Sequence, residues 1–293
     1  MRRAAAALVA AVLLLATGCG EDGSSADADD LLRKGFSTDV ESGLFGLHVE
    51  ADLEGPDGAE ARVEARASGP FSAYSSTALP ELDWELSLDA PGFGFDGRVI
   101  ATRENAFVEY GGTTYEFGAK AWQALADEPL AEGSLLTFRE AGIDPLDWVR
   151  DAEADEEEVD GRSFDRVTGT LDVKAMLDDV RKLLPAAQRE DLPSGDQIES
   201  VVEDPEFTAL IGDDGIWRRL ELELDFEVPA GDFDSIGGLE SGHVRIEMTL
   251  SEPNQEQVIE LPESGRPLTE LLQELGIAPE SLLGPGAQAP QPG

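Results

Sequence analysis

A single cysteine, Cys19, is the most reactive side chain in this sequence of 293 residues. It follows a short basic start, Met1–Arg3, and an apolar stretch from Ala4 to Thr17. This layout is typical of a secretory signal peptide, and the stretch is shorter than the roughly 20 residues that a membrane-spanning helix needs. Since a lone thiol in an exported protein has no disulfide partner, we expect Cys19 to have an assigned chemistry.

The segment around the cysteine, which reads LLLATGCG, indicates what that chemistry is. Small residues at Thr17 and Gly18 match the lipobox of bacterial lipoproteins, although Ala16 stands where that pattern usually has leucine. In the lipobox pattern the thiol is acylated and the peptide before it is removed. We therefore expect an exported protein that is anchored to the outer face of the cell membrane through Cys19. An ordinary signal peptide with an incidental cysteine is the alternative.

The other residue types predict neither a catalytic nor a metal site. His48 and His243, the two histidines, alternate out of phase with apolar neighbours, so we expect both to face solvent rather than a catalytic triad or zinc. Gly92–Gly97 matches a dinucleotide fingerprint, but strand-like residues follow where that motif needs a helix. The acidic run Asp151–Asp160 lacks the spacing of a calcium loop and is predicted to be an exposed loop. We expect a protein that is not an enzyme and that binds no metal or cofactor.

The strongly acidic composition limits the classes of molecule that this protein could bind. Acidic residues outnumber basic ones by 62 to 21, which gives a formal net charge of −41. Contacts with nucleic-acid phosphates need clusters of Lys and Arg, so the composition argues against nucleic-acid binding. Attraction to anionic lipid head groups is disfavoured for the same reason. We expect contact with the membrane through the N-terminal lipid anchor.

Alternation of apolar and polar residues with a period of two dominates the chain and predicts strands with one buried face. Examples are Leu47–Leu53, Ala61–Ala67 and Leu220–Val228, and turn sequences such as GPDG separate neighbouring segments. Short connections of this kind favour one extended antiparallel meander. Shorter helices are predicted near Leu31–Phe36, around Trp122, at Trp148, from Val173 to Leu184 behind an Asp172 cap, near Ile198–Val202, and over Pro267–Leu275.

The composition also predicts the organisation of the chain. Residues 1–18 form the signal peptide, and 19–30 form the lipidated cysteine and a flexible acidic tether. Residues 31–276 form one domain, and 277–293 form a disordered tail rich in Gly and Pro.

The balance between sheet and helix raises the question of a binding cavity. A curved sheet with short helices across its mouth could enclose room for an acyl chain on its apolar side. The alternative is that the same side chains pack against the helices as an ordinary filled core. The large apolar residues that are candidates for such a cavity are Trp84, Leu86, Phe93, Phe95, Trp122, Trp148, Leu222, Leu224, Phe226 and Met248.

The order of elements and several segments resemble the LppX/LprG-type lipoproteins of actinobacteria, which are similar in fold to the LolA and LolB lipoprotein carriers. The resemblance extends over most of the chain from Leu31 to Leu275. It is carried by the opening hairpin (44–67), NAFVEYGGTTYEF (105–117), VDGRSFDRVTGTLDVKAML (159–177) and GIWRRLELELDFEVP (215–229). It implies an α+β, mainly antiparallel fold: an unclosed, curved half-barrel of about 9 to 11 strands with short helices on the concave face.

The same resemblance implies binding of a lipid or an acylated molecule in a hydrophobic cavity, for transport or presentation at the membrane. The resemblance supplies no motif for individual ligand contacts, so the cavity candidates depend on alternation alone. A non-enzymatic interaction, scaffold or sensor lipoprotein with the same fold, a filled core and an envelope protein partner is the alternative.

Overall fold

The structure is a computed structural model, and it describes residues 28–55, 58–72, 81–127, 145–183, 195–229 and 238–277. Cys19, the expected signal peptide and the expected tail from 278 onward lie outside the described residues. Ala28–Asp30, which the sequence places in the tether, form the first turn of a helix, α2 (Ala28–Ser37).

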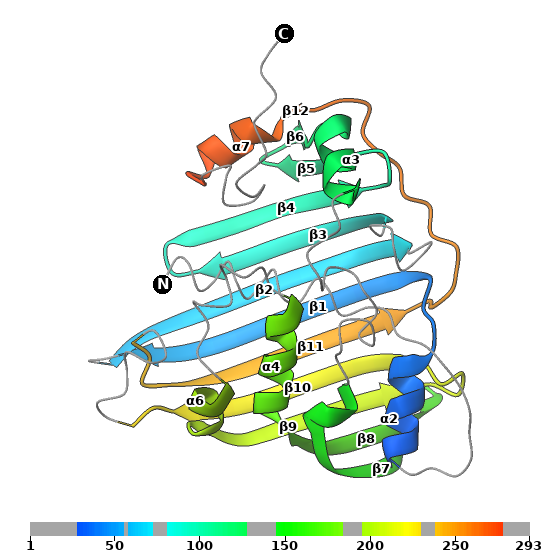
Figure 1. The fold of residues 1–293 in the computed structure, drawn as a ribbon, viewed down its shortest axis with the longest axis vertical. Coiled ribbons are helices and arrows are strands. Elements are labelled where there is room, and N and C mark those ends of the chain that lie inside the picture. Colours follow the sequence, from blue (N-terminus) through cyan, green and yellow to red (C-terminus); the bar gives the residue numbers. More distant parts are fainter. Residues whose placement is uncertain are drawn as a thin grey trace.

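Twelve strands form one unclosed sheet, in the order β12-β6-β5-β4-β3-β2-β1-β11-β10-β9-β8-β7 (Figure 1). All neighbouring pairs are antiparallel except the short parallel pair β12–β6. The mainly antiparallel, unclosed α+β fold that the sequence predicts is confirmed. The strands are β1 (Ser42–Gly55), β2 (Ala59–Ser72), β3 (Glu81–Ala90), β4 (Phe93–Ala101), β5 (Ala106–Tyr110), β6 (Thr113–Glu116), β7 (Val149–Val159), β8 (Arg162–Leu171), β9 (Val202–Ile211), β10 (Trp217–Glu227), β11 (Ser241–Ser251) and β12 (Arg266–Pro267).

The helices are short, and α2, α4 and α6 lie over one face of the sheet, which we call the inner face (Figure 1). The opposite face is called the outer face. Helices α3 and α7 lie at the β5–β6 end of the sheet. The helices other than α2 are α3 (Ala119–Asp127), the 3-10 helix η2 (Pro145–Trp148), α4 (Val173–Leu183), α6 (Gly195–Glu199) and α7 (Leu268–Glu274).

The strand register explains why the inner face is apolar. Residues that alternate along each strand line up across the sheet, so a buried position on one strand faces a buried position on the next. One such row is paired strand by strand from β9 to β4, and it spans roughly 30 Å at about 4.8 Å per strand. It consists of Phe207, Leu222, Ile246, Val49, Ala65, Leu88 and Phe95.

The outer face carries the intervening polar positions as a ladder of charges. Glu223 lies opposite Arg245, and Arg245 lies opposite Glu50, whose carboxylate also pairs with Arg62 of β2 at 2.9 Å. Arg245 pairs with Glu221 and Arg98 makes a two-pronged contact with Asp83, at 2.5 and 2.6 Å. Such partly exposed pairs contribute little stability each, but opposite charges on adjacent strands favour the observed register.

The helices on the inner face cover one end of the sheet. Asp172 caps α4 as the sequence predicts, because its Oδ1 accepts a hydrogen bond of 2.9 Å from the Ala175 N–H. Trp148 of η2 is buried beneath α4, and its Nε1 donates to Asp179 Oδ2 at 2.8 Å. These contacts join β7, β8 and the helices into the main hydrophobic core.

Helix α7 is attached to the opposite end of the sheet. Tyr115 of β6 is 2% exposed, and its hydroxyl donates to Glu274 Oε2 at 3.0 Å. Burial raises the pKa of Tyr115, and the hydrogen bond to Glu274 and its negative charge act in the same direction.

The acidic run from Asp151 to Asp160 corrects one prediction. It is not an exposed loop, because most of it forms the edge strand β7, which pairs with β8. The residues of the acidic run have weak preferences for helix and strand. The turn that follows, Asp160-Gly161, has φ angles of 52° and 74°, which suit a tight hairpin between β7 and β8. Backbone pairing with β8 and the ion pair between Glu157 and Arg166 outweigh the local preference of an acidic run for a loop.

Candidate ligand-binding face

The candidate cavity residues fall into two groups, one buried and one partly exposed. Trp84, Trp148, Leu222 and Met248 are at most 6% exposed and belong to the main hydrophobic core. Leu86, Phe93, Phe95, Trp122, Leu224 and Phe226 are partly exposed. The sequence predicts all ten as candidates for lining a lipid cavity, and the structure distinguishes those that are buried in the core from those that are partly exposed.

Four of these border positions, together with the partly exposed Leu88, lie near the hairpin ends of β3, β4 and β10, and we call these five residues the inner rim. On one side of the rim, Phe95 stacks on Tyr110 with ring centroids 5.2 Å apart and an interplanar angle of 5°. The Phe95 ring lies over Gly97, where an added Cβ would come within 2.7 Å of it. The residues of the inner rim are Leu88, Phe93, Phe95, Leu224 and Phe226.

Smaller apolar residues connect the two sides of the inner rim. Leu224 lies opposite Val244, which lies opposite Ala51, and Ala51 lies opposite Val63. Phe226 lies opposite Gly242, and a Cβ added there would lie 2.6 Å from the Phe226 ring. Phe93, at 38% exposed, is one of two large apolar side chains that are clearly exposed in the described part of the chain. The rim is therefore a partly exposed apolar strip at one end of the inner face.

Trp84 stands out among the buried candidates. It is 5% exposed, and its ring stacks on Phe45 of β1 at 5.1 Å and 23°. Gly69 of β2 separates the two strands at this level and has no side chain to keep the rings apart. The Nε1 of Trp84 is buried and has no hydrogen-bond partner within the part of the chain that the structure describes.

Trp122, by contrast, lies apart from the rim on α3. It packs edge-to-face on Phe117 at 5.4 Å, and its Nε1 donates to the carbonyl oxygen of Thr102 at 2.7 Å. Together with Trp148, it holds a helix against the sheet rather than joining the inner rim.

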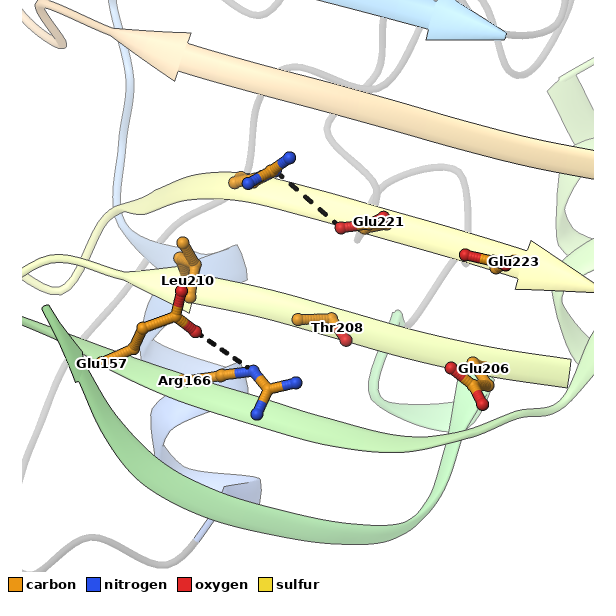
Figure 2. Close-up of a pocket in the computed structure, with 8 residues that line it drawn as sticks. Glu157, Arg166, Glu206, Thr208, Leu210, Glu221 and Glu223 are labelled. Carbon is orange, nitrogen blue, oxygen red and sulfur yellow. Dashed lines mark ion pairs between the residues drawn. The ribbon is translucent and has the colours of Figure 1, made fainter. Parts of the chain in front are cut away.

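Sequence reasoning missed the pockets of the outer face. One, of about 240 Å³, lies on β8, β9 and β10, on the side of the sheet away from α2 (Figure 2). Its arginines are neutralised by carboxylates, because Arg166 pairs with Glu157 at 3.2 Å and Arg219 with Glu247 at 2.5 Å. The hydrogen bond to Glu247 raises the pKa of Arg219. The pocket is lined by Glu157, Arg166, Glu206, Thr208, Leu210, Arg219, Glu221 and Glu223.

A second outer-face pocket, of about 420 Å³, lies between β3–β5 and the segment that leads to β12. Arg98 and Asp83 form its polar side, and the hydrogen bonds that Arg98 donates to the Asp83 carboxylate raise the pKa of Arg98. Val258, Leu261 and Pro262 form its apolar side. Neither pocket contains a residue that the sequence analysis named as a candidate. In an alternating strand pattern, charged positions indicate only the side that faces solvent, so they gave no sign of a pocket.

The histidines lie on the outer face and are partly exposed, as predicted. His48 Nε2 is 3.2 Å from Glu64 Oε1 and 3.6 Å from Glu50 Oε1, and potential ligand atoms of the three residues lie within 4.8 Å of one another. Arg62 lies 2.9 Å from Glu50, and Arg66 pairs with Glu64. Because these guanidinium groups already balance the carboxylates, we assign no metal ion to this group.

No protein-family model matches the chain, and no curated protein matches it. Among solved structures it is similar to LprF from Mycobacterium bovis, with 15% identity and a TM-score of 0.44, over 83% of this chain and 100% of that one. It is also similar to a DUF1329 family protein from Desulfovibrio piger, with 11% identity and a TM-score of 0.21, over 79% and 93% of the two chains. A LolA superfamily protein from Nitrosomonas europaea has 8% identity and a TM-score of 0.21, over 82% and 96%.

Because all of these TM-scores are below 0.5, we draw no conclusion about family or function from these similarities. Within the described ranges, no helix has the length and apolar character needed to cross a membrane.

Proposed function

We propose that this protein is an exported lipoprotein, anchored through an acylated Cys19, that binds a lipid or acylated molecule at the inner face of its sheet. Its role would be to transport or present that ligand at the membrane surface, without catalysis. The proposal is supported above all by the inner rim, whose apolar side chains remain partly exposed in a protein with a net charge of −41. A contiguous apolar surface surrounded by polar residues is typical of a binding site.

The proposed binding mechanism is burial of the ligand's methylene groups against the rim. Each buried methylene contributes about 0.8 kcal/mol, so partial burial of a long acyl chain is sufficient for micromolar affinity. Leu88 and Phe95 would contact one stretch of the ligand's hydrocarbon, and Leu224 and Phe226, on the far side of the rim, another. The charged outer face would remain in water and keep the loaded protein from self-association.

A binding titration with a matched control tests the proposal. The probe is methyl palmitate, delivered from methyl-β-cyclodextrin and detected by displacement of a fluorescent apolar dye. The double variant Phe95→Ser/Leu224→Ser should bind at least tenfold more weakly, because it places hydroxyl groups in the rim. The control is Val258→Ser, which makes the same kind of change at a residue that is 76% exposed and contributes to the outer-face pocket.

Melting temperatures of the variants separate loss of binding from loss of folding. Absence of methyl palmitate binding by the folded wild-type protein would contradict the proposal. Equal weakening by the rim variant and the Val258 control would contradict the rim as the site.

A second candidate, a protein-interaction or scaffold lipoprotein, is favoured by one specific observation. Trp84, Trp148, Leu222 and Met248 are buried in the main hydrophobic core, as in an ordinary filled core. This candidate predicts a protein recovered by crosslinking in the envelope of the host and no change of melting temperature with methyl palmitate.

A further inference from the structure

Trp84 carries a buried hydrogen-bond donor that has no acceptor among the described residues. The unpaired atom is its indole Nε1, and the side chain is only 5% exposed. By contrast, the indole of Trp122 donates to the Thr102 carbonyl at 2.7 Å, and that of Trp148 donates to Asp179 at 2.8 Å. Buried polar groups are nearly always paired, so the exception at Trp84 calls for an explanation.

The surroundings of Trp84 argue against a charged or aqueous partner. Its ring stacks on Phe45 at 5.1 Å, and Val99 lies opposite it on β4. A buried water typically makes about three hydrogen bonds, and the side chains of Phe45 and Val99 offer it none besides the Trp84 donor. A charged phosphate or carboxylate would be desolvated there without a cation beside it.

The position of Trp84 connects it with the inner rim. Trp84, Leu86 and Leu88 alternate along β3, so all three face inward, and Leu88 is part of the rim. At roughly 3.3 Å per residue, Trp84 and Leu88 lie about 13 Å apart along the strand. An acyl chain that lay along β3 from the rim would bring its neutral end group towards the indole.

We propose that Trp84 Nε1 donates a hydrogen bond to the carbonyl oxygen of an acyl ester in the bound ligand. This inference rests on the proposed function and extends it, because it names the ester as the polar group that the site recognises. Trp84 sets the depth of the ester, and the rim contacts the hydrocarbon.

The variant Trp84→Phe tests this assignment, because phenylalanine keeps an aromatic ring but has no N–H group. It is titrated with methyl palmitate and with octadecane, which has no carbonyl, both delivered from methyl-β-cyclodextrin. We expect methyl palmitate to bind threefold to tenfold more weakly than to the wild type. The affinity for octadecane should differ by less than twofold between Trp84→Phe and the wild type.

The control Phe45→Leu disturbs the packing of Trp84 and leaves its N–H group in place. We expect it to affect the two probes equally. Equal weakening of both probes by Trp84→Phe would overturn the ester assignment and leave the rim proposal intact. If neither probe binds the wild-type protein, it is the proposed function that fails.

Nitrogen-15 NMR of the tryptophan indoles gives an independent readout. The signal that is missing in Trp84→Phe should move downfield in the wild-type protein with methyl palmitate and stay in place with octadecane. An unmoved signal at saturation would also overturn the assignment.

The ester can belong to a free lipid or to an acylated protein. Titration with dipalmitoylglycerol and with a diacylglyceryl-cysteine peptide distinguishes these sources. The source is the ligand that binds the wild type more tightly and also binds Trp84→Phe more weakly than the wild type. If Trp84→Phe weakens neither of them, the assignment is wrong for both.

Discussion

Single residues determine how the helices are held over the sheet. Asp172 does so twice, because one of its carboxylate oxygens caps α4 and the other accepts a hydrogen bond from Arg150 Nε at 2.8 Å. The Arg150 side chain is 52% exposed, so this ion pair is screened and contributes little. The cap is the larger contribution.

Replacement of Asp172 tests that assignment. We expect Asp172→Ala to lower the free energy of unfolding in urea by about 1 kcal/mol, because the Ala175 N–H loses its acceptor. Asp172→Ser keeps a capping oxygen and loses the pair with Arg150, so it should retain most of the stability. Equal losses in both variants would show that the ion pair, not the cap, stabilises α4.

At the scale of elements, the edges of the sheet are the places where an unclosed fold is vulnerable. β7 pairs with β8 on one side, and no described strand pairs with its other side. An open edge offers unpaired backbone groups to a second chain, and charged side chains are one way in which proteins prevent such pairing. Glu156 and Glu158 are exposed on this strand, so we infer that the acidic run protects the edge.

Removing these charges should promote self-association. The double variant Glu156→Thr/Glu158→Thr replaces two charges by strand-forming residues, and we expect a larger oligomeric fraction in sedimentation velocity at 100 µM than for the wild type, by roughly tenfold. Glu85→Thr/Asp89→Thr makes the same change of charge at exposed positions of the central strand β3 and should leave the fraction unchanged. If both variants associate equally, net charge rather than the edge controls association.

At the scale of the whole molecule, the proposed anchor and the proposed binding face define one arrangement. The residues between Cys19 and Ala28, the first residue of α2, can span at most about 30 Å when extended. The domain would therefore stay within reach of lipids at the bilayer surface while its net charge of −41 keeps it from adhering to anionic head groups.

Replacement of the cysteine tests the anchor separately from ligand binding. In a bacterial host, Cys19→Ala should abolish labelling with radioactive palmitate and move the protein from the membrane fraction to the soluble fraction. Two or more acyl chains are needed for stable anchoring, so loss of the attachment site should be decisive. Purified domains with and without the cysteine should bind methyl palmitate equally. Retention of label in Cys19→Ala would contradict the assignment.

The sequence by itself determined the periodicity of this protein, and with it most of the fold. Strict alternation at positions such as Leu47–Leu53 is sufficient to predict strands with one apolar face, and the Asp172 cap is sufficient to predict the start of α4. These are local properties, because side-chain direction and capping depend on neighbours within a few residues. The same local reasoning failed at β7, where pairing with β8 makes a strand of an acidic run.

Only the tertiary structure decided which apolar side chains fill the core and which reach the rim. Trp84 and Phe95 belong to the same alternating pattern, yet one is 5% exposed and stacked on Phe45, while the other lies at the partly exposed end of the sheet. The difference depends on which elements cover each position and on Gly69 of the neighbouring strand β2, and burial of this kind is a property of contacts distant in sequence. The sequence likewise does not show that the indole of Trp84 has no acceptor among the described residues, because this can be recognised only when its neighbours are in place.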